Sequence, residues 1–107
     1  MLKQQKHQKE IEKIVKQIRE KYNPEKIILF GSFAYGKPRE NSDVDLIVIK
    51  KTKERFTQRL IKIAGAISSF LGTDILVYTP EEWQQAIEEE NYFIKEVAQK
   101  GKVLYAK

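Results

Sequence analysis

The sequence contains no cysteine, and its 107 residues include only one histidine, one methionine and one tryptophan. Without cysteine the chain can form no disulfide, no thiolate metal site and no thiol nucleophile, and such a composition fits a reducing compartment. Long apolar runs are also missing, because none approaches the roughly 18 residues that a membrane span needs. Residues 1–13 are rich in lysine and glutamine, where a secretion signal would be apolar. We therefore expect a cytoplasmic protein that has no membrane partner.

Aspartate is scarce as well, although acids in general are not. Of the 15 acidic residues 12 are glutamate, and the three aspartates are Asp43, Asp45 and Asp74. With 33% of the residues charged and 41% hydrophobic, the composition is that of a globular protein and not of a disordered one. A chain this short fits one domain. We therefore expect residues 1–107 to form a single domain, without a separate substrate-binding unit.

The net charge of +5 does not by itself predict a nucleic-acid site. Residues 50–62 carry six bases, whereas residues 79–96 carry six acids and a single base. No aromatic side chains interleave with the bases at positions where they could stack on nucleobases. We interpret the basic run as a solvated helix face and expect no nucleic-acid partner.

Hydrophobic periodicity predicts an α/β chain of the α+β kind, in which helices pack on a small mixed sheet. The apolar spacing predicts helices over residues 5–22 and 56–71, the second ended by Gly72, and a further helix, or a broken pair that restarts at Asn91, over 80–100. Apolar runs predict strands over residues 26–30, 43–49, 73–78 and, at an edge of the sheet, 103–105.

The order of these elements predicts where the aspartates lie. A helix joins strand 43–49 to strand 73–78, and a crossover of this length makes its two strands parallel neighbours. Strand 26–30 runs the opposite way, because the loop after it must deliver the chain to the start of strand 43–49. The sheet is therefore mixed, and it brings Gly31, Ser32 and all three aspartates to one edge.

The residues at this edge predict a site for a metal and a phosphate. Asp43 and Asp45 are two positions apart on one face of a strand, about 6.6 Å from each other along it. A lone pair of this kind is more often a cap at a loop-to-strand boundary, but Asp74 begins the next strand in the same way. Three clustered carboxylates repel unless cations neutralise them, and oxygen ligands suit Mg²⁺ or Mn²⁺. Gly31 allows close backbone approach, and Ser32, which we expect to cap a short helical turn, offers a hydroxyl.

The spacing of these residues resembles a signature of the polymerase β-like nucleotidyltransferase superfamily. Gly31 and Ser32, ten residues, and then Asp43-Val44-Asp45 match its pattern G-S-x10-D-x-D, and Asp74 stands where its third carboxylate is expected. The resemblance covers residues 27–105. The short chain and its ending look specifically like the minimal nucleotidyltransferases, the MNT antitoxins of the MntA type.

The resemblance implies the fold of that superfamily and a role for each residue. Asp43 and Asp45 would bind two Mg²⁺ ions, or Mn²⁺, while Asp74 would complete the shell of the second ion and accept a proton. The backbone around Gly31 and Ser32 would hold the phosphates of ATP. Nucleoside monophosphate would then pass to a hydroxyl group, and pyrophosphate would leave.

One position departs from the pattern of the family. Its members often have G-S-x-A-R-G, but this sequence has Tyr35 where the arginine would be. Tyrosine supplies no positive charge to a triphosphate, so Lys37 or Arg39 would have to do so. With Ser42, which belongs to the S-D-x-D-L core of the signature, these two residues complete the predicted nucleotide-binding set.

The leading hypothesis is an antitoxin that transfers AMP from ATP to a hydroxyl, expected to be a tyrosine, of a HEPN-family toxin. The chain has three aspartates in place but is too short to carry its own acceptor domain. One alternative is a weak or inactive antitoxin that neutralises its partner by binding alone, which the tyrosine in place of arginine favours. Another is transfer of a nucleotide to a small molecule such as an aminoglycoside.

The other residues that attract attention have simpler interpretations. We expect the single histidine, His7, to be a solvated surface residue on a charged helix. Four aromatic residues are expected in the core more than at an interface, namely Trp83, Tyr92, Phe93 and Tyr105.

Overall fold

The protein is a single sheet flanked by helices, and it is described here by a computed structural model that covers residues 2–39 and 41–107. The elements along the chain are α1 (Leu2–Tyr22), β1 (Lys26–Phe30), α2 (Ser32–Tyr35), β2 (Val44–Ile49), α3 (Phe56–Ala66), β3 (Thr73–Tyr78), α4 (Pro80–Glu88), α5 (Tyr92–Lys100) and β4 (Lys102–Ala106). The four strands are ordered β3-β2-β1-β4. This is the α+β class that the sequence predicts.

The sheet is mixed, as predicted, and its pairing fixes the position of the aspartates. β2 and β3 are parallel and are joined by α3, whereas β1 is antiparallel to both β2 and β4. β4 lies at one edge of the sheet and β3 at the other. The start of β2, the start of β3 and the end of β1 therefore meet at one end of the sheet.

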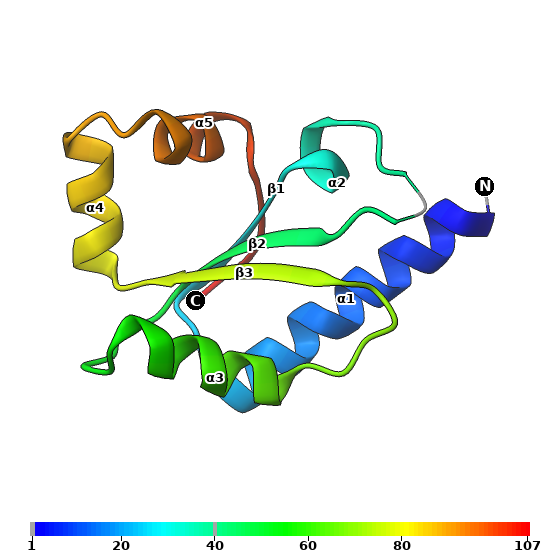
Figure 1. The fold of residues 1–107 in the computed structure, drawn as a ribbon, viewed down its shortest axis with the longest axis horizontal. Helices are drawn as coiled ribbons and strands as arrows, with labels where there is room; N and C mark the ends of the chain where they lie inside the picture. The colour runs from blue at the N-terminus through cyan, green and yellow to red at the C-terminus, as the bar shows by residue number, and fades with distance from the viewer. Residues whose placement is uncertain (1, 40) are drawn as a thin grey trace.

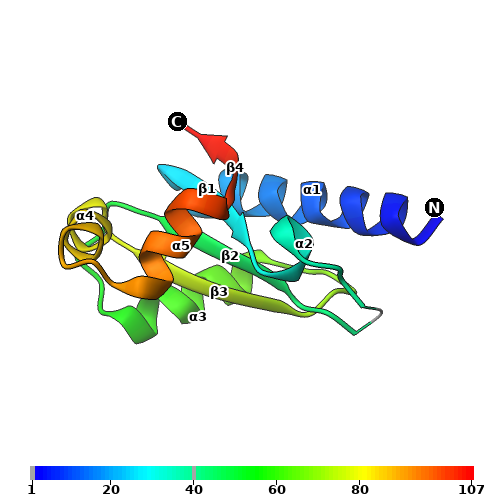
Figure 2. The same ribbon diagram turned by 90° about the horizontal axis from the view of Figure 1, so that it is seen from above.

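Helices cover both faces of the sheet. In Figure 1, α1 and α3 lie below the sheet and α4 and α5 lie above it, and Figure 2 shows α5 crossing the upper face. Strand alternation gives each face its own core. In β2, Leu46 and Val48 pack toward α1 and α3, whereas Ile47 and Ile49 pack toward α5.

The long helix α1 packs through the apolar stripe that the sequence predicts. Ile11, Ile14, Ile18 and Tyr22 are buried against the sheet and α3. The helix ends where Asn23 takes a left-handed φ of 51° ahead of a proline. In the part of the chain that the structure describes, no helix combines the length and the apolar character needed to cross a membrane.

The helix predicted over 56–71 is shorter than expected, and this prediction is wrong at its C-terminal end. α3 ends at Ala66, and residues 67–72 form an irregular loop. The amides of Ser68 and Phe70 donate to the side chains of Gln17 and Glu10 in α1 in place of helical carbonyls. These acceptors are 51 and 60 residues away along the chain, so the local apolar period could not reveal them.

The helices α4 and α5 form the broken pair that the sequence left open. Thr79 and Glu82 make the expected capping box, with proline at the first position of α4. α5 restarts after Asn91, whose side chain accepts a hydrogen bond from the Ile94 amide.

Two aromatic side chains expected in the core are at the surface instead. Tyr92 is 82% exposed and Phe93 is 38% exposed, while Trp83 and Tyr105 are half-buried. α5 packs on the sheet through Ile94 and Val97, so the first position of the helix points away from the core.

Two polar predictions also need correction. The basic run is not wholly solvated, because Arg59 is only 7% exposed and its guanidinium donates to a Glu82 carboxylate oxygen at 2.7 Å. This arginine also donates to the Val77 carbonyl, which ties α3 to the end of β3. His7 is half-buried, not fully solvated, and its ring packs edge-on against Phe33 at a centroid distance of 5.3 Å.

Candidate functional site

The three aspartates lie on one face of the sheet at the end described above. Asp45 in β2 and Asp74 in β3 are register partners in neighbouring parallel strands, which lie about 4.8 Å apart. Asp45 lies on the same face of the sheet as Ile47, whose side chain joins the core under α5. Asp43 lies one residue before β2 and two residues before Asp45, so its side chain is expected on the same face as that of Asp45. The crossover thus places Asp45 and Asp74 side by side at one end of the sheet, as the order of the elements predicts.

Gly31 makes room for the carboxylate of Asp45. The last residue of β1, Phe30, is the register partner of Asp45, so Gly31 follows directly beside it. Gly31 has a φ of 73°, and a Cβ there would overlap the Oδ2 atom of Asp45. Only glycine adopts this conformation without strain and leaves that space free.

Gly72 likewise leaves room for the carboxylate of Asp43. A Cβ at Gly72 would overlap the Oδ1 atom of Asp43, and the Gly72 carbonyl accepts a hydrogen bond of 2.8 Å from the Val44 amide. From the sequence, Gly72 is expected only to end a helix. Its position two residues before Asp74 was the one available signal that it borders the site.

The electrostatics of the site favour a bound cation. Burial raises the pKa of the Asp45 carboxyl, and the nearby charges of Asp74 and Asp43 raise it further. Each of these effects disfavours the carboxylate form, and a positive charge beside Asp45 would reverse them. The donor set, carboxylate oxygens alone, suits Mg²⁺ or Mn²⁺.

The three carboxylates are not arranged around a common point at which a metal ion could bind. Among the residues that the structure describes, no three or more histidine, cysteine, aspartate or glutamate side chains are arranged to hold a metal ion. The Asp45 carboxylate lies against Gly31, and that of Asp43 lies against Gly72. The backbone thus brings the three residues to one edge, whereas the side chains of Asp43 and Asp45 turn toward the two glycines.

The loop after β1 differs in detail from the prediction. Gly31, and not Ser32, is the N-cap of the four-residue helix α2, and it makes no side-chain cap. The Gly31 carbonyl accepts hydrogen bonds from Ala34 and Tyr35 at 3.0 and 3.1 Å, which closes the turn tightly. Ser32 is half-buried as the first residue of α2. The correction follows from the left-handed glycine, which bends the chain before a serine side chain could cap it.

The remaining predicted nucleotide-binding residues lie on the loop between α2 and β2. Lys37 and Arg39 are exposed there. The Ser42 hydroxyl accepts a 2.7 Å hydrogen bond from the Arg39 amide, and the Ser42 amide donates to the Arg39 carbonyl. Ser42 therefore closes this loop just before Asp43. Tyr35, the departure from the family pattern, is 43% exposed at the end of α2.

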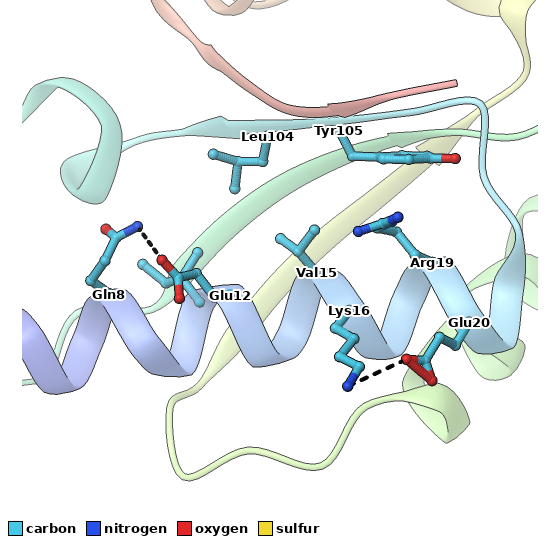
Figure 3. Close-up of a pocket in the computed structure, with 9 residues that line it drawn as sticks. Gln8, Glu12, Val15, Lys16, Arg19, Glu20, Leu104 and Tyr105 are labelled. Atoms are coloured by element: carbon cyan, nitrogen blue, oxygen red, sulfur yellow. Dashed lines mark hydrogen bonds and ion pairs between the residues drawn. The ribbon is translucent and has the colours of Figure 1, made fainter.

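A groove lies between α1 and β4, away from the aspartates. Figure 3 shows the guanidinium of Arg19 facing the ring of Tyr105, and the distance from guanidinium to ring centroid is 4.7 Å. The groove has a volume of about 640 Å³. Its acids have partners on α1, since Glu12 accepts from Gln8 and Glu20 pairs with Lys16. This groove has no cluster of carboxylates, unlike the edge that holds the aspartates.

The chain belongs to the polymerase beta nucleotidyltransferase family, whose model matches residues 12–107. It is therefore an enzyme of the nucleotidyltransferase class, as its G-S-x10-D-x-D spacing predicts.

The chain is also similar to particular proteins of known sequence or structure. A Methanocaldococcus jannaschii protein that is provisionally named a protein adenylyltransferase is 29% identical over an alignment of 105 positions, which covers 92% of this chain and 97% of that protein. A crystal structure from Sulfolobus solfataricus, provisionally described as a nucleotidyltransferase, has the same fold, with a TM-score of 0.70 and 19% identity over 97% of this chain and 84% of that one.

Two toxin–antitoxin crystal structures are also similar. One, which contains AMP-PNP, has a TM-score of 0.60 and 25% identity, and the match covers 90% of this chain and 73% of that one. The other is an MntA–HpeT complex with two aspartates changed to glutamate, and it has the same coverage, a TM-score of 0.56 and 21% identity.

Proposed function

We propose that the protein transfers AMP from ATP to a hydroxyl group of a partner protein, and that it acts as an antitoxin toward that partner. The observation that carries the proposal is the meeting of Asp43, Asp45 and Asp74 on one face at one end of the sheet, with Gly31 and Gly72 beside two of the carboxylates. The relative named as a protein adenylyltransferase and the toxin–antitoxin structure with AMP-PNP support both parts. We further propose that the partner is a HEPN-family toxin and that the hydroxyl is a tyrosine.

Each residue of the site has a role in the proposed reaction. Gly31 and Ser32 present backbone amides to the phosphates of ATP, and the side chains of Lys37 and Arg39 add positive charge. Ser42 holds the loop that carries these bases. Asp43, Asp45 and Asp74 would hold Mg²⁺ or Mn²⁺. When bound, two such ions would supply charge neutralisation for the triphosphate and would lower the pKa of the attacking hydroxyl.

The transfer needs no reactant besides ATP and the acceptor hydroxyl. The acceptor oxygen bonds to the α-phosphorus of ATP, the bond from that phosphorus to the bridging oxygen breaks, and pyrophosphate leaves. Asp74 accepts the hydroxyl proton. We propose that the acceptor comes on a second chain, which the similarity to two toxin–antitoxin structures supports.

The test is incubation of the protein with α-labelled ATP, Mg²⁺ and the product of the neighbouring gene. The wild type should label the partner, Asp43→Ala should not, and Glu88→Ala, a change of an exposed acid on α4, should label like the wild type. Absence of label in all three reactions would contradict the proposal.

A second candidate function is neutralisation by binding alone. Tyr35 favours it, since the position lacks the positive charge that the family pattern supplies to the triphosphate. Protection of cells from the partner separates the two candidates. A variant with Asp43→Ala and Asp45→Ala that still protects fully would support the binding function and would contradict the enzymatic one.

A further inference from the structure

Glu10 of α1 is a buried acid that no step of the proposed reaction uses. Glu10 is only 8% exposed and lies on the side of α1 that faces the body of the protein. Its Oε2 atom accepts a 3.2 Å hydrogen bond from the Phe70 amide and lies 3.5 Å from the ammonium of Lys13. A hydrogen bond from the Ser69 side chain lowers the pKa of Glu10, burial opposes this effect, and the Phe70 amide adds to it. Buried carboxylates need such partners, and two of these partners are in the loop before β3.

A second side chain of α1 binds the same loop. Gln17 stands seven residues after Glu10, which is two helical turns along the same side of α1. Its side-chain oxygen accepts a 3.1 Å hydrogen bond from the Ser68 amide. The side chains of Gln17 and Glu10 therefore accept the hydrogen bonds that helical carbonyls would accept if α3 continued. These two hydrogen bonds attach the loop to α1.

The far end of this loop reaches the aspartates. Its last residue, Gly72, accepts the hydrogen bond from Val44 and lies beside the Asp43 carboxylate, and β3 then begins one residue before Asp74. A shift of the loop would therefore move both the surface under Asp43 and the start of the strand that carries Asp74. Phe33 of α2 also packs against α1, through His7. The N-terminal half of α1 thus contacts segments on both sides of the aspartate site.

We propose that Glu10 is a positioning residue of the aspartate site: it holds loop 67–72, and thereby fixes Gly72 beside Asp43 and the start of the strand that carries Asp74. The link to catalysis rests on the proposed function, whereas the link from Glu10 through Gly72 to Asp43 does not. Glu10 acts through the loop and touches neither the aspartates nor a substrate. The same bonds explain why the chain leaves the helix at Ala66.

Three variants separate this role from a general effect on the fold. Glu10→Ala removes the acceptor of the Phe70 amide. Glu10→Gln keeps an oxygen in the same place and should therefore retain a hydrogen bond from the Phe70 amide. Lys13→Ala removes the half-exposed ion-pair partner of Glu10 but leaves the bond to the loop. Two measurements follow for each variant: exchange of the Phe70 and Val44 amides in metal-free protein by NMR, and binding of Mn²⁺ with AMP-PNP by calorimetry.

Glu10→Ala should speed exchange of the Phe70 amide at least about 10-fold, as expected for loss of a bond to a charged group. It should also speed exchange of the Val44 amide, which donates to Gly72, and weaken binding of Mn²⁺ with AMP-PNP about 10-fold. Glu10→Gln should change every readout clearly less than Glu10→Ala does, by about 5-fold or less, since a neutral acceptor keeps about half of the bond. Lys13→Ala should behave like the wild type.

The proposal is overturned if Glu10→Ala loosens Phe70 but leaves both the Val44 amide and metal–nucleotide binding unchanged, because Glu10 would then be structural only. Equal losses in Glu10→Gln and Glu10→Ala would overturn it too. If Glu10→Ala does not fold, Gln17→Ala removes the other tie and should shift the same readouts in the same direction, and no shift would overturn the proposal. If the wild type binds no AMP-PNP, the proposed function fails, while exchange of the Val44 amide still decides whether Glu10 positions the loop.

Discussion

Replacing Gly72 by alanine should separate the geometry of the site from the stability of the fold. A Cβ at Gly72 would stand 2.1 Å from the Oδ1 atom of Asp43, whereas ordinary contact begins at 3.4 Å. The carboxylate oxygen must therefore move by about 1.3 Å, the difference between the two distances. A misplacement of about 1 Å in a catalytic group costs on the order of 100-fold in rate. We expect Gly72→Ala to slow transfer of AMP by about that factor.

The stability of the fold should change little. The overlapping atom is the end of a short, exposed side chain, so a rotation of Asp43 relieves the overlap and no shift of the backbone is needed. We expect the free energy of unfolding to stay within about 1 kcal/mol of the wild type. Gly65→Ala is the matched control, because Gly65 lies exposed in α3, where an alanine methyl group would meet no atom of the described residues within 4 Å apart from its chain neighbours and the backbone of its own helix. That variant should gain about 0.5 kcal/mol from helix propensity and keep the wild-type rate.

The assay pairs the initial rate of label transfer from ATP with urea unfolding of each variant. A wild-type rate in Gly72→Ala would refute the reasoning, since the position of Asp43 against Gly72 would then not matter. A loss of more than about 3 kcal/mol in stability would refute the other half, because more than a flexible carboxylate would have to move.

The remaining predictions concern two residues that bind α3 to α4 and one that lies in α2. Arg59→Met should lower the free energy of unfolding by about 2 kcal/mol in urea titrations, less than for a fully buried pair because Glu82 is 45% exposed. The hydrogen bond from Arg59 lowers the pKa of Glu82 below 4.5, so its stabilisation is present above that pH and is lost as the pH falls through the lowered value. Glu82→Gln should therefore be less stable than the wild type at pH 7, and the difference should shrink in acid; a difference independent of pH would contradict this. Tyr35→Arg should lower the KM for ATP by about 5-fold through added positive charge, and an unchanged KM would show that Lys37 and Arg39 suffice.

Much of the fold could be predicted because the signals for it are local. The capping box at Thr79 and the glycine after β1 each mark an element boundary within a few residues. The meeting of Asp45 with Asp74 was also predictable, because a crossover helix of ordinary length leaves parallel strands in few arrangements.

Other features depend on contacts between distant segments. The end of α3 is set by side chains of α1 that are more than 50 residues away, so the apolar period of residues 56–71 continued past the true helix end. The contact between Gly72 and Asp43 and the burial of Arg59 arise in the same way. Phe93 reaches the ring of Phe30 at a centroid distance of 5.3 Å yet stays partly exposed, which composition alone could not indicate.

The most direct test of the central claim is electron paramagnetic resonance of Mn²⁺ added to the protein together with AMP-PNP. If the three aspartates form a metal and nucleotide site, the wild type should bind Mn²⁺ in the presence of the nucleotide, and Asp45→Asn should lose that binding while it keeps its fold. The Glu88→Ala control should bind like the wild type. Equal Mn²⁺ binding by the wild type and Asp45→Asn, or none by either, would contradict the assignment of the site.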